Sequence, residues 1–448
     1  MQDVLGDIVE KDELYGLLLE FDEHNTKESN FAYLCDKLEA DIQAKVYQDR
    51  GEQRSLAAAA LLTAAFQGIN AQEIQNFQNR QPLVSPELTA ETITFRLRAN
   101  YATEVSVQAS WMGYGPEAQK AGRMTKGEGG VWSVTLPRPA SELYTYTFTV
   151  DGVSVLDPAN LFVQRDGTRF MSAVLVDGGY ADNYKECSRP GNIEHVWYYS
   201  GTNDMVRRMY VYTPFGYDRN DKKTKYPVLY LLHGGGGDED AWSTLGRTQQ
   251  ILDNLIAQGK ATPMLVVMPN GNPNQYAAAT LQIPVKQDIK RYPNGFDNYD
   301  SMVADIVPYI EKNYNVIKER KGRAVAGLSM GGGQSFYIAL RNVDTFANVG
   351  IFSSGLIGGS GAGQAEFNPE AQMPGLISTP AKYNKFDLFY LSCGESDNRI
   401  GGTAAFYEQL KGLGYNNLVY ETYPGGHEWH VWRRNLASFV QKVFKNVK

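Results

Sequence analysis

The alternation of apolar and polar positions changes twice along this chain of 448 residues, and each pattern predicts a different kind of structure. Residues 1–53 place charged and apolar residues at helical spacing, which predicts a short helical segment. Residues 82–180 alternate with a period of two in stretches such as ETITFRLRA, EVSVQASW and LYTYTFTVDG, separated by turn residues. Residues 190–448 instead alternate continuous apolar runs with amphipathic segments, the pattern of strands and helices in α/β proteins.

The period-two region, residues 82–180, predicts a β-sandwich. Alternation alone places about half of its side chains inside, so its aromatic residues are expected to pack in the core more often than to form a sugar-binding surface. These aromatic residues are Trp111, Trp132, Tyr144 and Tyr146.

The last region, residues 190–448, predicts a mainly parallel sheet covered by helices on both faces. Its runs YPVLYLLHGG, PMLVVMPNG, GRAVAGLS, KFDLFYLSCG and NLVYETYPGG are apolar or β-rich and end in glycine or a turn. Functional groups of such sheets gather beyond the carboxyl ends of the strands. The expected fold class is therefore α/β, preceded by a β-sandwich and a short helical segment.

The Ala-rich stretch RSLAAAALLTAAFQGINAQ, Arg54 to Gln72, lies in the linker region 54–81 and has the pattern of a signal peptide. A basic residue precedes an apolar segment, and the small residue Ala71 follows. Because the stretch starts so far from residue 1, we expect an upstream fusion or a misplaced start in front of a secreted or periplasmic protein. An Ala-rich buried helix is the alternative.

Charge and cysteine content exclude several classes of function. The net charge of −7 argues against nucleic acid and against an anionic membrane surface as partners. The three cysteines, Cys35, Cys187 and Cys393, lie far apart with no CxxC pair, so neither a zinc site nor a disulfide framework is expected. No apolar run reaches the roughly 18 residues of a membrane span.

The motif Gly327-Leu328-Ser329-Met330-Gly331 is the candidate for chemistry, and Ser329 is its candidate nucleophile. A G-x-S-x-G sequence between a strand and a helix holds the serine on a sharp turn, where the glycines let the strand and the helix approach each other. The apolar run RAVAG precedes the motif and GGQSFYIALRN follows it, so both neighbours are as the motif requires. A plain tight turn is the alternative.

A serine nucleophile needs a base, and the chain has only five histidines: His24, His195, His233, His427 and His430. His427 follows a predicted strand and a Pro-Gly-Gly turn, which leaves it on a loop above the sheet, so we expect it to be the base. His195 lies in a predicted antiparallel pair and His233 in a glycine turn, and His430 already belongs to the next helix. These three are expected to be structural.

The stretch LFYLSCGESDNRI offers two carboxylates, Glu395 and Asp397, just past a strand end. An orienting acid fixes the tautomer of the histidine and stabilises the imidazolium that forms. Asp397 is preferred over Glu395, in part because of the family resemblance described below. The order serine, acid, histidine is that of α/β-hydrolases.

The charge that develops on the carbonyl oxygen of an ester needs hydrogen-bond donors. The backbone N–H of Met330 is one by its position after the serine. The glycine-rich loop HGGGGDEDAW matches the HGGG-type loop of esterases, and its Gly235, with Gly234 as the alternative, is expected to supply the second donor.

These motifs together resemble the esterase D-like α/β-hydrolases, specifically carbohydrate esterase family one, which comprises bacterial feruloyl and acetyl xylan esterases. The similarity rests on YPVLYLLHGGGGDEDAW, MPNGN, GLSMGGGQSF, LSCGESDN and GGHEWHVWRRNL, and it spans about residues 195 to 445. The stretches SPELTAETITFRLRA and YTFTVDGVSVLDPAN resemble an immunoglobulin-like E-set domain of the carbohydrate-binding module family 48 type. Residues 1–53 resemble the trailing helices of HD-type phosphohydrolases but lack a His-Asp dipeptide, so no chemistry is assigned to them.

The resemblance implies a serine esterase with Ser329 as nucleophile, His427 as base and Asp397 as acid. It also implies hydroxycinnamoyl esters of plant cell-wall arabinoxylan as substrates, with feruloylated or acetylated xylan as the polysaccharide partner and no metal or organic cofactor. Loop residues expected to contact substrate are Trp242, Asn270, Gln334 and Trp429, and packing is the alternative for both tryptophans. The alternative functions are an acetyl xylan esterase, a transferase of the same fold and a non-catalytic carbohydrate-binding protein.

Overall fold

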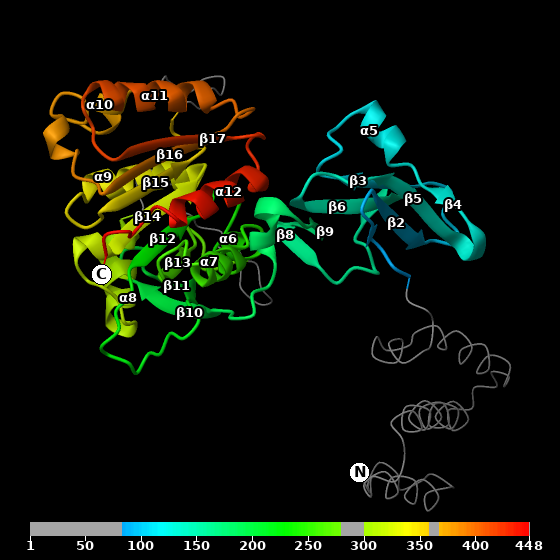
Figure 1. The fold of residues 1–448 in the computed structure, drawn as a ribbon, viewed down its shortest axis with the longest axis horizontal. Helices are drawn as coiled ribbons and strands as arrows, with labels where there is room; N and C mark the ends of the chain where they lie inside the picture. Colours follow the sequence, from blue (N-terminus) through cyan, green and yellow to red (C-terminus); the bar gives the residue numbers. More distant parts are fainter. Residues whose placement is uncertain (1–82, 279–299, 358–366, 448) are drawn as a thin grey trace, which may run out of the picture. The chain divides into compact units, whose positions relative to one another are not determined.

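The computed structural model describes residues 83–278, 300–357 and 367–447 (Figure 1). The predicted helical segment 1–53 and the signal-like linker 54–81 lie outside the described residues. Within the described part of the chain, no helix is long and apolar enough to cross a membrane.

Two antiparallel sheets form the first part of the described chain. One sheet has the strand order β1-β2-β5-β4, and the other has the order β3-β6-β9-β8, with β7 paired to β6. Their bounds are β1 Glu87–Leu88, β2 Thr92–Arg98, β3 Val105–Ala109, β4 Thr125–Lys126, β5 Val131–Pro137, β6 Glu142–Val150, β7 Val153–Val155, β8 Val163–Asp166 and β9 Arg169–Val176. Helix α5 (Pro116–Ala121) and the 3-10 turn η1 (Glu128–Gly130) connect strands of this part.

The period-two pattern has the predicted effect in these sheets. Strand β2 alternates buried and half-buried residues, and its Ile93, Phe95 and Leu97 enter one core with residues of β6 such as Tyr146 and Phe148. Of the four aromatic residues named above, three are buried here and Trp111 packs on Phe95 and Tyr144. The two sheets thus share a core as a sandwich does, and the E-set assignment stays a prediction.

An eight-stranded sheet with the order β10-β11-β13-β12-β14-β15-β16-β17 forms the second part. β10 and β11 are an antiparallel hairpin, β11 is antiparallel to β13, and all later pairs are parallel. The bounds are β10 Asn192–Ser200, β11 Met205–Thr213, β12 Val228–Leu232, β13 Leu265–Pro269, β14 Arg323–Leu328, β15 Asn348–Phe352, β16 Leu388–Gly394 and β17 Leu418–Tyr423.

Helices cover both faces of this sheet, which is why its strands are continuous apolar runs. In β12, Val228, Tyr230 and Leu232 enter one core cluster, while Leu229 and Leu231 enter the other. The longer helices are α7 Thr248–Ala257, α8 Val307–Asn313, α9 Met330–Arg341, α11 Ile400–Gly412 and α12 Trp429–Val440. The short ones are η2 Gly179–Tyr184, α6 Ala241–Thr244, η3 Met302–Ile306, η4 Arg320–Gly322, α10 Pro369–Gln372 and η5 Pro380–Lys382.

A buried ion pair joins the sandwich to the α/β part. Nη2 of Arg433 on α12 lies 2.9 Å from Oε1 of Glu142, the first residue of β6, and both side chains are 3% exposed. The same guanidinium donates to the carbonyl oxygens of Leu143, at 2.7 Å, and Leu245, at 2.8 Å. Leu143 and Ala173 of the sandwich also belong to the core cluster that contains α7 and α12. The two parts therefore share buried contacts, both charged and apolar.

Breaking this pair is expected to lower stability strongly. Glu142→Gln removes the charge that compensates the buried guanidinium, so we expect a loss of about 3–5 kcal/mol in the free energy of unfolding. Urea titration followed by fluorescence measures it. Arg138→Ala, which removes the exposed pair with Asp177 at 2.7 Å, is the control and should change stability by less than about 1 kcal/mol. If both substitutions lowered the free energy of unfolding by the same small amount, the ion pair of Arg433 and Glu142 would not have the stabilising role expected of it.

Candidate active site

Ser329 lies between the end of β14 and the first residue of α9, at the carboxyl edge of the sheet. Its backbone has φ 50° and ψ −111°, a conformation that non-glycine residues adopt rarely. Its N–H donates to the carbonyl of Phe352 at 2.9 Å, and its carbonyl accepts from the N–H of Gly355 at 2.8 Å. The neighbouring strand thus holds the turn, and the strained geometry is that of the predicted sharp strand-to-helix connection.

The two glycines of the motif are required by close backbone approach. A Cβ at Gly327 would lie 2.5 Å from the carbonyl carbon and oxygen of Gly331. A Cβ at Gly331 would lie 2.5 Å from the carbonyl oxygens of both Leu232 and His233 at the end of β12. Helix α9 therefore starts in contact with the backbone at the end of the neighbouring strand β12, and only glycine, which has no Cβ, fits there.

The structure brings Ser329, His427 and Asp397 together. Nε2 of His427 lies 3.0 Å from Oγ of Ser329, and Nδ1 lies 2.7 Å from Oδ2 of Asp397. The carboxylate side chain is fully buried, while the imidazole is 29% exposed. Since Asp397 accepts, Nδ1 carries the proton, and Nε2 is left free to accept from the serine hydroxyl.

Asp397 is held in its charged form. Burial raises its pKa, but hydrogen bonds from His427 and from the backbone and side chain of Arg399 outweigh that effect and bring the pKa to about 2. The N–H of Arg399 donates to Oδ1 at 3.0 Å, and its Nη1 lies 3.1 Å from the same oxygen. Nη1 also lies 3.3 Å from Nδ1 of His427, but both nitrogens are donors, so we assign no hydrogen bond there.

Another glycine explains how the loops that carry the acid and the histidine meet. A Cβ at Gly394, the last residue of β16, would lie 2.5 Å from the carbonyl oxygens of Gly425 and Gly426. The loop after β16 carries Asp397, and the Pro-Gly-Gly loop after β17 carries His427. Direct backbone contact between these two loops therefore fixes the distance between the two side chains.

Among the described residues, His195, His430 and Glu395 lie in structural or exposed positions, and His24 lies outside the described residues. His195 stacks on its cross-strand partner Tyr210 with ring centroids 3.8 Å apart. His430 pairs with Glu428 at 2.7 Å. Glu395 is exposed on the loop, whereas Asp397 two residues later is buried against the imidazole.

The glycine loop after β12 lies beside Ser329. A Cβ at Gly234 would lie 3.3 Å from Cβ of Ser329, while a Cβ at Gly235 would have no heavy atom within 4 Å. Gly234 is thus packed against the serine turn, and Gly235 borders open space. The N–H of Met330, at the first position of α9, belongs to the helix-end donors that have no intrahelical partner. Gly235, with Gly234 as the alternative, stays a prediction as the second donor.

His233 connects two loops at this edge of the sheet. Its Nδ1 donates to the carbonyl of Gly234 at 2.7 Å, and its Nε2 accepts from the N–H of Gly271 at 2.8 Å. Complete burial lowers its pKa, so the ring is neutral and can serve as donor at one nitrogen and acceptor at the other. The expected role in shaping the glycine turn agrees with these contacts.

Three predicted substrate contacts need correction. Trp242, Asn270 and Gln334 are 1%, 0% and 1% exposed. The indole of Trp242 donates to the carbonyl of Leu232 at 2.8 Å. The amide of Asn270 donates to Glu239 at 3.2 Å, and that of Gln334 donates to the carbonyl of Gly271 at 2.7 Å. These side chains point into the protein interior, and their hydrogen bonds hold the loops around Ser329.

Trp429 is the fourth predicted contact, and it is half-buried at the start of α12. It packs edge-on against Trp242 and Trp432, with ring centroids 5.4 and 5.2 Å away. Trp432 in turn lies edge-on against the ring of His427 at 4.9 Å. Trp429 keeps partial exposure near the imidazole, so contact with substrate stays a prediction for this residue.

Sequence reasoning missed Arg399. The residue supplies two of the hydrogen bonds that keep Asp397 ionised. The signal was its position two residues after the acid, in a loop short enough to bring the two charges together.

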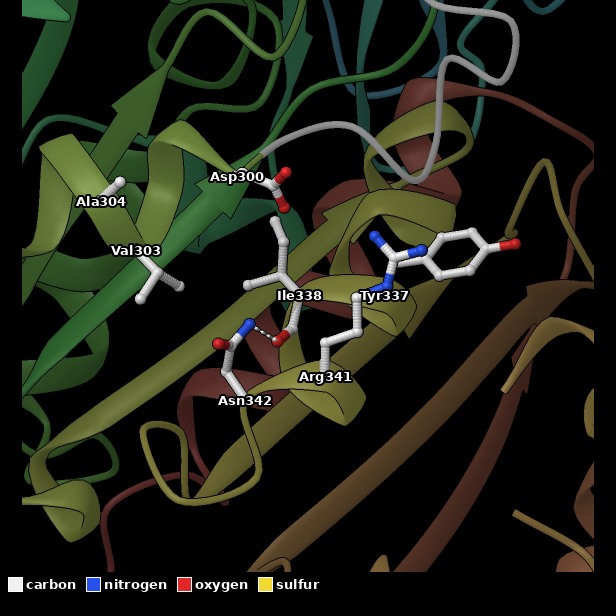
Figure 2. Close-up of a pocket in the computed structure, with 7 residues that line it drawn as sticks. All are labelled: Asp300, Val303, Ala304, Tyr337, Ile338, Arg341 and Asn342. Atoms are coloured by element: carbon white, nitrogen blue, oxygen red, sulfur yellow. Dashed lines mark hydrogen bonds between the residues drawn. The ribbon is translucent and has the colours of Figure 1, made fainter. Parts of the chain in front are cut away.

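A cavity of about 210 Å³ lies elsewhere in the α/β part and is lined by Asp300, Val303, Ala304, Tyr337, Ile338, Arg341 and Asn342. Figure 2 shows the guanidinium of Arg341 beside the ring of Tyr337, at 4.8 Å from its centroid. Tyr337 lies eight residues along α9 from Ser329, about 12 Å at the rise of an α-helix. The cavity is therefore separate from the serine turn. Among the described residues, no group of three or more His, Cys, Asp or Glu could hold a metal ion.

Comparisons with known proteins identify the family of the chain. Residues 200–443 match the protein family described as "Putative esterase". The chain belongs to this esterase family. The expected enzyme class, a carboxylic ester hydrolase, is thereby confirmed.

Two curated relatives of this esterase chain are longer proteins. "Endo-1,4-beta-xylanase/feruloyl esterase" of Xylanibacter ruminicola is 30% identical over 371 residues, which are 81% of this chain and 46% of that protein. "Endo-1,4-beta-xylanase Y" of Acetivibrio thermocellus is 29% identical over 178 residues, which are 37% of this chain and 14% of that protein. The chain thus spans less than half the length of these relatives.

A solved structure, the enterobactin esterase of Shigella flexneri, has the same fold at 16% identity and a TM-score of 0.57. The similarity covers 85% of this chain and all of the other one. The covered share of this chain is larger than the α/β part alone, so the similarity in fold extends into the strands that precede the α/β part.

The two carboxylates of the acid loop are expected to differ sharply in effect. Asp397→Asn should lower kcat for a simple ester by about 10⁴-fold, because the imidazole loses the partner that fixes its tautomer. Glu395→Gln, on the same loop but exposed, should leave kcat unchanged. Steady-state hydrolysis of p-nitrophenyl acetate measures both, and equal losses would remove Asp397 from its predicted role.

Gly331→Ala is expected to prevent correct folding or to cost several kcal/mol in the free energy of unfolding, since its methyl group would overlap the backbone oxygens of Leu232 and His233. Gly401→Ala is the control on α11, where a Cβ meets nothing within 4 Å, and it should raise stability by up to about 1 kcal/mol. Thermal unfolding measures both. A Gly331→Ala protein with unchanged stability would contradict the close approach.

Proposed function

We propose that this esterase hydrolyses hydroxycinnamoyl esters, feruloyl esters in particular, on plant cell-wall arabinoxylan. The observation that carries the catalytic part is the continuous hydrogen-bonded series from Oγ of Ser329 through His427 to Asp397, at 3.0 and 2.7 Å. The proposed reaction is a two-step acyl transfer through a covalent serine ester.

In the first step Nε2 of His427 takes the proton of Ser329 as the hydroxyl oxygen attacks the ester carbonyl. Asp397, ionised at every ordinary pH because its pKa is about 2, stabilises the imidazolium that forms. The N–H groups of Met330 and Gly235 donate to the oxyanion. His427 then gives its proton to the departing alcohol, which is the polysaccharide hydroxyl.

In the second step water replaces the alcohol. His427 takes a proton from the water, the hydroxide oxygen attacks the acyl carbonyl, and the same two N–H groups receive the second oxyanion. Collapse of this intermediate releases the free acid and returns the proton to Ser329. Every proton transfer in both steps passes through the imidazole of His427, and no other acid or base is required.

The choice of substrate is supported by the relative from Xylanibacter ruminicola, whose name includes feruloyl esterase. The half-exposed Trp429, two residues from His427, offers a ring on which a phenolic acyl group or a sugar can stack. An acetyl xylan esterase would use the same serine, acid and histidine and would differ in the size of the acyl site. Substrate comparison distinguishes the two.

The deciding experiment compares wild type and Ser329→Ala on methyl ferulate and on an acetylated xylo-oligosaccharide. Wild type should release ferulic acid, and the variant should be slower by about 10⁶-fold, since subtilisin loses that much when its serine is removed. A fluorophosphonate probe should add one phosphonyl group to wild type and none to Ser329→Ala, as measured by intact mass.

The outcomes separate the alternatives. Release of acetate with negligible release of ferulic acid would assign the acetyl xylan esterase activity instead. Equal background release by wild type and Ser329→Ala on both esters, with no probe labelling, would contradict catalysis and favour a carbohydrate-binding protein.

A further inference from the structure

We propose that Arg165 of the β-sandwich is a positioning residue for the oxyanion-binding loop, so that the sandwich is a functional part of the ester-hydrolysing site. The inference rests on the proposed function and adds a role for a residue outside the α/β part. Its basis is a set of contacts between the β8–β9 hairpin and the segment Gly234–Asp240.

The guanidinium of Arg165, the third residue of β8, clamps the acidic end of the glycine loop. Its Nη1 lies 2.9 Å from Oδ2 of Asp238, and its Nη2 lies 2.9 Å from Oδ1 of the same carboxylate. Nη2 also lies 3.3 Å from Oδ2 of Asp240. The arginine side chain is 14% exposed and that of Asp238 is 9% exposed, so solvent screens this two-point contact only weakly.

The glycine loop needs such an anchor because its own residues make few contacts. Gly235 and Gly236 are exposed, and a Cβ on either would meet nothing within 4 Å. Glycine has the largest backbone freedom of any residue, so the direction of the Gly235 N–H depends on how the two ends of the loop are held. His233 holds the first end through its hydrogen bonds to Gly234 and Gly271.

Asp238 holds the second end. Its Oδ1 accepts from the N–H of Asp240 at 3.1 Å, and its carbonyl accepts from the N–H of Ala241, the first residue of α6, at 3.1 Å. The N–H of Gly237 donates back to the carbonyl of Gly234 at 3.2 Å, which closes the turn. Fixing the carboxylate of Asp238 therefore fixes the turn that contains Gly235.

The hairpin itself reaches the same loop. Nη1 of Arg165 donates to the carbonyl of Gly167 in the β8–β9 turn at 2.6 Å. A Cβ on Gly167 would lie 3.2 Å from the carbonyl oxygen of Gly236. The turn of the sandwich and the turn of the glycine loop are thus close neighbours, and one guanidinium bonds to both.

A second arginine anchors the next residue from the α/β side. Nε of Arg208 on β11 donates to Oε1 of the buried Glu239 at 2.6 Å, and Glu239 accepts from the N–H of Ala278. Asp238 and Glu239 are therefore fixed by two different arginines, one from each part of the chain. Loss of Arg165 leaves Glu239 in place and frees only the side of the loop that faces Gly235.

The test measures kcat, KM and thermal stability of Arg165→Met and Arg165→Lys on p-nitrophenyl acetate, whose small size avoids contacts with polysaccharide. We expect Arg165→Met to lower kcat by about 10- to 100-fold with KM changed less than about threefold, because a misplaced donor acts on the transition state and not on ground-state binding. Arg165→Lys keeps the charge without the two-point contact and should give an intermediate kcat.

Two further variants distinguish positioning from general destabilisation. Asp238→Asn should resemble Arg165→Met, and the double variant should be no slower than either single one, since both changes remove the same contact. Glu142→Gln breaks the ion pair with Arg433, another contact between the two parts, and should lower the melting temperature while kcat at a temperature well below melting stays unchanged.

An unchanged kcat in folded Arg165→Met would overturn the inference. A decrease of kcat in Glu142→Gln as large as that in Arg165→Met would overturn it as well. If Arg165→Met does not fold, a wild-type kcat in Arg165→Lys has the same meaning. A wild-type protein that hydrolyses no ester would overturn the proposed function itself, which separates the two failures.

Discussion

The candidate site depends on close contact between backbones at the carboxyl edge of one sheet. At Gly327, Gly331 and Gly394 a methyl group would lie 2.5 Å from backbone atoms of the first turn of α9, of the end of β12 and of the loop after β17, respectively. The first contact closes the serine turn on itself, the second brings that turn against the end of β12, and the third brings the acid loop against the histidine loop. The hydrogen bonds among the three side chains are short because the backbones that carry them already touch.

This constraint explains which features the sequence could predict. A motif such as Gly327–Gly331 encodes its geometry locally, and the order of Ser329, Asp397 and His427 follows from the order of strands whose ends share one edge. The period-two and continuous apolar patterns likewise encode which strands are covered on one face and which on both. The sandwich core and the parallel sheet could therefore be predicted from the sequence.

The direction in which a side chain points could not be predicted from the sequence in the same way. Trp242, Asn270 and Gln334 follow strand ends or begin helices near the site, and proximity in sequence cannot tell whether a side chain points up toward substrate or down into the packing. Arg165 is a stronger case, because 73 residues and a change of sheet separate it from Asp238. Nothing in its local pattern, a charged residue on a short strand, signals the carboxylate that it meets.

The buried pair of Arg433 and Glu142 also has a consequence for where this protein can be divided. The stretch YKECSRPGN, residues 184–192, has the composition of a linker. The α/β part on its own would nevertheless carry an arginine whose carboxylate partner Glu142 and carbonyl partner Leu143 stay behind in the sandwich. A division that keeps this pair intact therefore leaves the sandwich and the eight-stranded sheet in one piece. Recombination at the linker would have to supply a new carboxylate together with each new sandwich.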